Sequence, residues 1–165
     1  MRSWRIYAVV VLCMSVLVGC TSPPAPTPEN TVTLDEAKAE AQAMELEIAT
    51  LIPPESVLSV DQKPKGVLLS CDGDQHSWNG STTVTLVPGT NPEVIVKDLE
   101  PRMANDDRFE STNWIGPTGK FRVQLVSTKT AANYIFGEGE GTTIVIDSGS
   151  PCFTLPEDVY PGGTF

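Results

Sequence analysis

The sequence predicts an α+β domain, a mostly antiparallel sheet with two helices packed on it, in the order α-β-β-β-α-β-β-β. Two segments carry apolar residues at helical spacing, and short β-rich runs between turn residues make up most of the remainder. Two helices are too few to connect every pair of strands by a crossover, so most strands should pair antiparallel. With 165 residues, 40% of them hydrophobic and 19% charged, the chain has the length and composition of one folded domain.

The first helix is expected to begin after Thr33, because Thr33 and Glu36 have the spacing of a capping box. Pro53 and Pro54 should end the helix after Ile52. Its apolar residues fall on one stripe that should face the core: Leu34, Ala37, Ala41, Met44, Ile48 and Leu51. Its acidic residues are expected on a solvent-exposed face: Asp35, Glu36, Glu40, Glu45 and Glu47.

The second helix is expected to begin at Asn91, because a residue before proline suits an N-cap and Pro92 suits the first helical position. Its apolar face consists of Ile95, Val96, Leu99 and Met103. Pro101 lies inside this pattern, so we expect the helix to kink there or to end near Glu100.

Strands are predicted where short runs are rich in β-branched and aromatic residues. These runs are 57–60, 67–69, 83–87 and 142–146, together with a hairpin of 109–114 and 121–125 around a turn at 116–119. Residues 134–136 are compatible with a strand or with an irregular apolar segment, and periodicity does not decide between them.

Residues 1–19 have the features of a lipoprotein signal peptide. Arg2 and Arg5 precede an apolar run at 6–18, which would be about 20 Å long as a helix and is short for a ~30 Å hydrocarbon core. The sequence Leu17-Val18-Gly19-Cys20 then resembles the bacterial lipobox. The resemblance implies cleavage before Cys20 and a diacylglyceryl group on its sulfur. The alternative is an ordinary secretory signal that happens to contain a cysteine.

Residues 20–32 should form a tether between the lipidated cysteine and the domain. Four prolines in this segment, Pro23, Pro24, Pro26 and Pro28, favour an extended spacer over a helix or strand. The folded domain is therefore expected over residues 33–165.

Cys71 and Cys152 are the two cysteines that remain once Cys13 is removed with the signal peptide and Cys20 is lipidated. In an exported protein such a pair indicates a disulfide. Two separate buried thiols are the alternative.

The segment 72–81 is predicted to be a polar loop that joins two strands, with a turn at Asn79-Gly80. It contains the only histidine of the chain, and its candidate ligand-binding residues are Asp72, Asp74, His76 and Trp78. In an extended segment, Asp72, Asp74 and His76 would point to one side and could hold a divalent ion. The sequence lacks the further ligands of an EF-hand or a zinc site, so we expect no cofactor.

The chain carries 11 Lys and Arg against 21 Asp and Glu, which argues against a nucleic-acid partner. Its lipobox, Pro-rich tether, helix ending at Pro53-Pro54 and two late cysteines resemble the small exported lipoproteins of actinobacteria of the LppA-like group. No catalytic residues come with this resemblance. We therefore expect a lipid-anchored, non-enzymatic envelope domain on the extracytoplasmic face of the membrane, which binds a small ligand or another envelope protein. The alternative is a small hydrolase or metal-dependent enzyme that uses His76.

Overall fold

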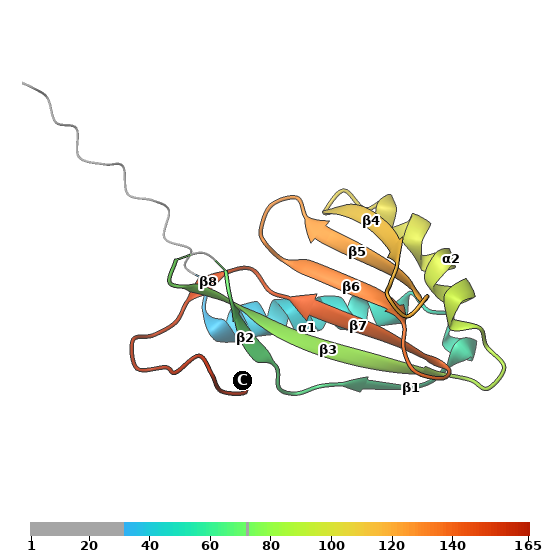
Figure 1. The fold of residues 1–165 in the computed structure, drawn as a ribbon, viewed down its shortest axis with the longest axis horizontal. Coiled ribbons are helices and arrows are strands. Elements are labelled where there is room, and N and C mark those ends of the chain that lie inside the picture. The colour runs from blue at the N-terminus through green and yellow to red at the C-terminus, as the bar shows by residue number, and fades with distance from the viewer. Residues whose placement is uncertain (1–31, 72) are drawn as a thin grey trace, which may run out of the picture.

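A computed structural model describes residues 32–71 and 73–165 of the protein (Figure 1). The expected signal peptide, Cys20 and nearly all of the tether lie outside the described residues, as does Asp72. The helices are α1 (Leu34–Thr50) and α2 (Pro92–Ala104), with a 3₁₀ turn, η1 (Pro54–Ser56). The strands are β1 (Val57–Gln62), β2 (Val67–Ser70), β3 (Gln75–Leu86), β4 (Phe109–Ile115), β5 (Phe121–Ser127), β6 (Asn133–Glu138), β7 (Thr143–Gly149) and β8 (Phe153–Thr154).

All described strands belong to one antiparallel sheet, which confirms the predicted α+β class. The strand order is β1-β3-β7-β6-β5-β4, and β2 and β8 pair with the first half of β3. The segment 134–136, which the sequence left open, lies within β6, where Tyr134 and Phe136 are buried and Ile135 faces the opposite side. Four consecutive strands, β4 to β7, therefore form a meander that β3 joins at β7.

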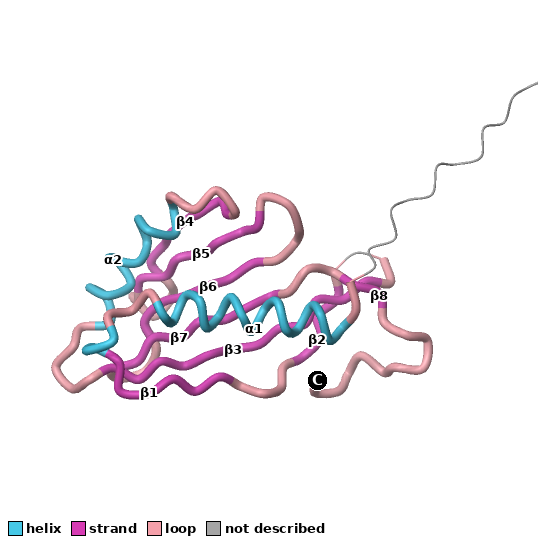
Figure 2. Tube along the Cα trace, turned by 180° about the vertical axis from the view of Figure 1, so that it is seen from behind, coloured by secondary structure: helices cyan, strands magenta, loops and turns pink. Residues whose placement is uncertain are grey.

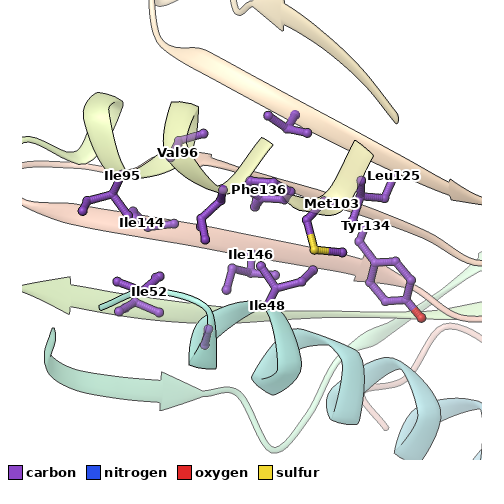
Figure 3. Packing of buried hydrophobic residues seen from close by; sticks show 14 of the residues in the cluster. Ile48, Ile52, Ile95, Val96, Met103, Leu125, Tyr134, Phe136, Ile144 and Ile146 are labelled. Carbon is purple, nitrogen blue, oxygen red and sulfur yellow. The ribbon is translucent and has the colours of Figure 1, made fainter. Parts of the chain in front are cut away.

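Both helices pack on the same face of the sheet. Figure 2 shows α1 lying across this face, with α2 beside it at the end of the sheet that contains β4 and β5. The main core lies between the helices and the strands (Figure 3), and it includes Ile48 of α1, Val96 and Met103 of α2, and Phe136 and Ile146 of the sheet. Burial of these side chains is the main source of stability for this arrangement.

The start and the buried stripe of α1 are as predicted. Thr33 accepts a hydrogen bond from the backbone of Glu36, and the Glu36 side chain accepts one from the backbone of Thr33 over 2.9 Å, which completes the capping box. Four of the six predicted core positions are buried: Ala37, Ala41, Met44 and Ile48. Leu34 and Leu51, at the two ends of the stripe, are partly buried and pack against the core clusters.

Pro101 does not end α2 near Glu100. The helix continues to Ala104, and Leu99 and Met103 on either side of the proline are both buried. The expectation of an early end was wrong because packing of these two side chains outweighs the hydrogen bond that a proline cannot donate. Asn105 caps this end of the helix by donating a 2.6 Å hydrogen bond to the carbonyl oxygen of Pro101.

The expected polar loop at 72–81 is mostly a strand. β3 runs through residues 75–86 without a turn at Asn79-Gly80, because strands on both sides satisfy its backbone groups. Gly80 is needed inside this strand because the Trp78 ring lies over it, so a Cβ at this position would overlap the ring. The segment was misread because the residues of β3 that face away from Trp78 here are Gln, Ser and Asn, which a loop would also contain.

The disulfide between Cys71 and Cys152 is present, with the two Cα atoms 6.2 Å apart. It ties the end of β2 to the segment just before β8. The C-terminal segment is also held by a second contact, because Phe165 exchanges backbone hydrogen bonds of 2.7 and 3.0 Å with Gly66. The carbonyl oxygen of Phe165 also accepts a 3.2 Å hydrogen bond from Nε1 of Trp78. The disulfide is therefore one of several attachments of this segment, which also include the pairing of β8 with β3.

Candidate functional site

A groove of about 350 Å³ lies between α1 and the ends of β4, β5 and β6, and we call it the α1–β6 groove. One wall consists of Glu40, Ala43, Met44 and Glu47 of α1. The remaining lining residues come from the strands, from the connection before β4 and from the β5–β6 connection: Arg108, Phe109, Ser127, Lys129, Thr130, Ala132 and Tyr134. The volume lies within the range of small-molecule sites, roughly 300–1,000 Å³.

Tyr134 of β6 contributes a hydroxyl group to the groove lining from an otherwise buried side chain. Its residue surface is only 2% exposed, and its ring meets the ring of Phe109 edge-to-face at 5.8 Å. Within the described part of the chain, its hydroxyl group makes no hydrogen bond, and it is not among the buried atoms that lack a partner, so the oxygen is open to solvent. Figure 3 shows this hydroxyl at the edge of the core, directed away from the labelled apolar side chains. The hydroxyl is therefore placed to bind a molecule that enters the groove.

The surroundings of Tyr134 keep its side chain in the neutral form. Burial is the main reason why the pKa of Tyr134 is raised to about 12. The negative charges of Glu40, Glu45 and Glu47 raise this pKa further, and Arg108 opposes them. The charged residues in the groove lining are Glu40 and Glu47, against Arg108 and Lys129.

Arg108 links the two walls of the groove. Its guanidinium group donates hydrogen bonds of 2.7 and 3.0 Å to Asp106, and it forms an ion pair with Glu47 of α1, 61 residues away in sequence. Asp106 and then Glu47 raise the pKa of Arg108, and the same contact lowers the pKa of Asp106. The N–H groups of the guanidinium already bond to the carboxylates of Asp106 and Glu47, so few donors are left for an anionic ligand. The ion pair with Glu47 also holds α1 near the start of β4.

Glu45 was expected on the exposed face of α1, and this expectation was wrong. Its side chain is completely buried and accepts hydrogen bonds from Thr82 over 2.6 Å, from Ser148 over 2.5 Å and from Gln62 over 2.9 Å. Gly80 leaves the space for it, since a Cβ there would lie 2.9 Å from Oε1 of Glu45. The three donors compensate for the water that the carboxyl group loses on burial.

One signal in the sequence could have placed Glu45 correctly. Ala41, Glu45 and Ala49 are spaced four residues apart, so Glu45 lies on a row of small buried residues along the helix. The other residues of the groove carry no such signal. Arg108 and Tyr134 come close to α1 only because the helix packs on the sheet that contains β4, β5 and β6.

Of the candidate residues of the 72–81 segment, the structure describes Asp74, His76 and Trp78, and it does not bring these three together into a site. Trp78 belongs to a second core cluster with Ala37, Ala41 and Phe153, and Lys38 lies over its ring at 5.6 Å. Asp74 is exposed and makes no hydrogen bond or ion pair with the described residues. Trp78 is therefore a core residue.

His76 lies in β3 and has no catalytic partner in the described ranges. Its Nδ1 atom is buried without a hydrogen bond, and no serine, cysteine or carboxyl group there bonds to its ring. Over residues 32–71 and 73–165, no three His, Cys, Asp or Glu side chains lie close enough to hold a metal ion. These contacts give no support to the hydrolase or metal-enzyme alternative.

Comparisons of the chain with protein-family models, curated proteins and solved structures found no match. The resemblance to the LppA-like lipoproteins therefore stays a prediction from the sequence layout. Neither helix of the described part combines the length and the apolar character needed to cross a membrane.

Proposed function

We propose that the protein is a lipid-anchored binding domain of the cell envelope that takes a small ligand into the α1–β6 groove. Cys20 would carry the anchor after removal of residues 1–19, and the domain would lie on the extracytoplasmic side of the membrane. A domain that only supports another envelope protein would be a less specific form of this proposal, because it would need no ligand in the groove.

The anchor is supported by the lipobox sequence that ends at Cys20. Two acyl chains hold a protein stably on a membrane, whereas one chain is marginal. The disulfide between Cys71 and Cys152 is compatible with an oxidising compartment. These observations agree with export but come from different parts of the chain.

The observation that carries the binding function is the unpartnered hydroxyl group of Tyr134 in the lining of the groove. The remaining lining is apolar at Met44, Phe109 and Ala132 and charged at the rim, which is the usual composition of a small-molecule site. No nucleophile with an adjacent base lines the groove, so its lining residues fit binding better than covalent catalysis.

The anchor is tested by labelling cells with a radioactive or clickable fatty acid. The wild-type protein should incorporate the label, and Cys20→Ala should lose it and leave the membrane fraction. Cys13→Ala is the matched control, because it changes a cysteine inside the expected signal peptide and should leave labelling intact. Label retained by Cys20→Ala would contradict the anchor.

The groove is tested by thermal unfolding of the full chain in detergent against a library of small molecules. Compounds that raise the unfolding temperature of the wild-type protein should lose this effect in Ala43→Trp, where the indole fills the groove. Ala39→Trp is the control, because Ala39 is also exposed on α1 but does not line the groove. Equal responses of the two variants to every stabilising compound would place the ligand site elsewhere.

A further inference from the structure

We propose that the outer edge of β4 is a dimer interface, at which a second copy of this chain adds its own β4 antiparallel and continues the sheet. This inference goes beyond the proposed function and does not depend on a ligand in the α1–β6 groove. It follows from three properties of β4: its free backbone groups, its regular and unprotected edge, and a sequence that matches itself in the antiparallel direction.

β4 forms one end of the sheet, with β5 on one side and no described strand on the other (Figure 1). The hydrogen bond from the backbone N–H of Thr128 to the carbonyl oxygen of Arg108 fixes how β4 bonds to β5. Alternate residues of an antiparallel strand point their backbone groups at the neighbouring strand, so in β4 the even-numbered residues bond to β5. The backbone groups of Ser111, Asn113 and Ile115 therefore point to the outer edge.

The two ends of the sheet differ in how they discourage pairing with another chain. β1, at the opposite end, has an irregular register between Val57 and Ser59, carries Asp61, and is followed by Lys63 and Pro64. Bulges, charges and prolines are the usual protection of edge strands. β4 pairs regularly with β5 over all of its 7 residues and contains no lysine or proline. A regular edge of this kind is a template for another strand.

One register matches the whole of β4 with its copy. The two-fold axis then passes between the two copies of Thr112, and the facing pairs are Ser111 with Asn113, Glu110 with Trp114 and Phe109 with Ile115 of the second copy. The outward-pointing backbone groups of Ser111 and Asn113 meet in this register, as a hydrogen-bonded pair requires. The same patch thus serves both subunits, which is the condition for a two-fold symmetric dimer.

This register also keeps like charges apart. Glu110 is the one charged residue among those of β4, and it would face Trp114 of the second copy. Like charges directly opposite each other destabilise a strand pair. The two copies of Glu110 would instead lie four residues apart along the paired strands, about 13 Å.

Two large apolar side chains at the end of β4 are exposed in the single chain. Ile115 is 61% exposed and Trp114 is 38% exposed. Ile115 lies on the helix-covered side of the sheet, because its partner in β5 is the core residue Phe121. In the dimer it would pack against Phe109 of the second copy, which itself packs on the main core. Burial of this apolar surface adds to the backbone hydrogen bonds.

Cysteine cross-linking of the full chain in detergent tests the dimer and its register. The two copies of Thr112 would form a non-hydrogen-bonded pair with Cα atoms about 4.5 Å apart, which suits a disulfide. Thr112→Cys should therefore give a covalent dimer on mild oxidation. Glu110→Cys should remain monomeric, because its copies are too far apart. Ser59→Cys, exposed on β1, is the control for random collision and should also remain monomeric.

Two further variants in the Thr112→Cys background test strand pairing. Asn113→Pro removes an outward-pointing N–H group and leaves the bonds to β5 intact, so it should abolish the covalent dimer. Asn113→Ala is its control, since both variants lose the side-chain hydrogen bond to Glu100 and only the alanine keeps the N–H group. Ile115→Glu places a charge at an exposed position against Phe109 of the second copy and should also abolish the dimer. Urea midpoints close to that of Thr112→Cys verify that these variants fold.

Three results would overturn the proposal. The first is a Thr112→Cys protein that stays monomeric, and the second is equal cross-linking of Thr112→Cys, Glu110→Cys and Ser59→Cys. The third is a covalent dimer that persists in folded Asn113→Pro or Ile115→Glu. None of these results bears on the α1–β6 groove, which the library screen with Ala43→Trp tests separately.

Discussion

Ser148 of β7 donates a 2.5 Å hydrogen bond to the carboxyl group of Glu45 on α1, across 103 residues of sequence. The bond joins the first helix to the last long strand inside the protein, where both residues are buried. Thr82 of β3 bonds to the same carboxyl group, so Glu45 connects α1 to two adjacent strands of the sheet, β3 and β7.

Glu45→Ala should therefore destabilise the domain. The substitution leaves the hydroxyl groups of Thr82 and Ser148 without their acceptor, whereas the amide of Gln62 keeps its 2.8 Å bond to the carbonyl oxygen of Gln42. Unsatisfied buried groups cost about 1–3 kcal/mol. Urea unfolding measures the loss. Glu40→Ala, on the exposed side of the same helix, should change the free energy of unfolding by no more than about 0.5 kcal/mol. Equal urea midpoints for the two variants would contradict the buried position of Glu45.

Gly80→Ala should destabilise the domain as well. The added methyl group would overlap the Trp78 ring and crowd Glu45, and overpacking of a core typically costs about 1–3 kcal/mol. Gly116→Ala is the matched control, because the nearest atom to a Cβ there is the carbonyl oxygen of Lys120 at 3.5 Å, an ordinary contact. A Gly80→Ala variant as stable as Gly116→Ala would show that the ring of Trp78 does not lie over Gly80.

Replacing Cys71 and Cys152 with serine should lower stability. The disulfide closes a loop of 81 residues, for which the chain-entropy model gives roughly 4.5 kcal/mol as an upper value. We expect a smaller loss, because Phe165 and Gly66 hold the C-terminal segment independently. Urea midpoints of the double variant with and without reductant should agree, whereas reductant should lower the midpoint of the wild-type protein. A wild-type midpoint that reductant does not change would speak against the bridge.

Tyr134 should make stability fall in alkaline solution. Its folded-state pKa is raised to about 12, whereas an unfolded tyrosine titrates near 10. The unfolded chain therefore loses this proton first, so the contribution is complete below about pH 10 and is lost as pH rises towards 12. Urea unfolding of wild-type protein and Tyr134→Phe over this range isolates the effect, since the phenylalanine variant lacks the ionisation. Parallel pH profiles of the two proteins would contradict it.

The parts of the fold that the sequence predicted depend on local patterns. The capping box of Thr33 and Glu36, the buried stripe of α1 and the N-cap of α2 at Asn91 involve residues close together in the chain, and all are present. The disulfide was predicted from the number of cysteines outside the leader. The parts that were missed depend on packing between distant segments. Glu45 is buried because Gly80 leaves room for it, and Pro101 is accommodated because its neighbours pack on the sheet.

The groove could not be predicted at all. Tyr134 lies in a segment for which periodicity was ambiguous, and Arg108 stands in the connection before β4. The two residues reach α1 only after β4, β5 and β6 have paired in register. The segment that looked most functional was singled out for Asp72, Asp74, His76 and Trp78, and among its described residues Trp78 packs in the core and Nδ1 of His76 is buried.

The pairing of β3 with β7 also constrains how the chain can acquire its structure. β4 to β7 are joined by short connections and can form contacts locally, but the seven residue pairs between β3 and β7 join residues 79–85 to residues 143–149. Non-local pairings of this kind slow folding, because a long loop must close before they form. During synthesis or export, the edge of β3 that receives β7 stays unpaired until residue 149 has emerged. A chain truncated before β7 would present this edge to other polypeptides and would be prone to aggregate.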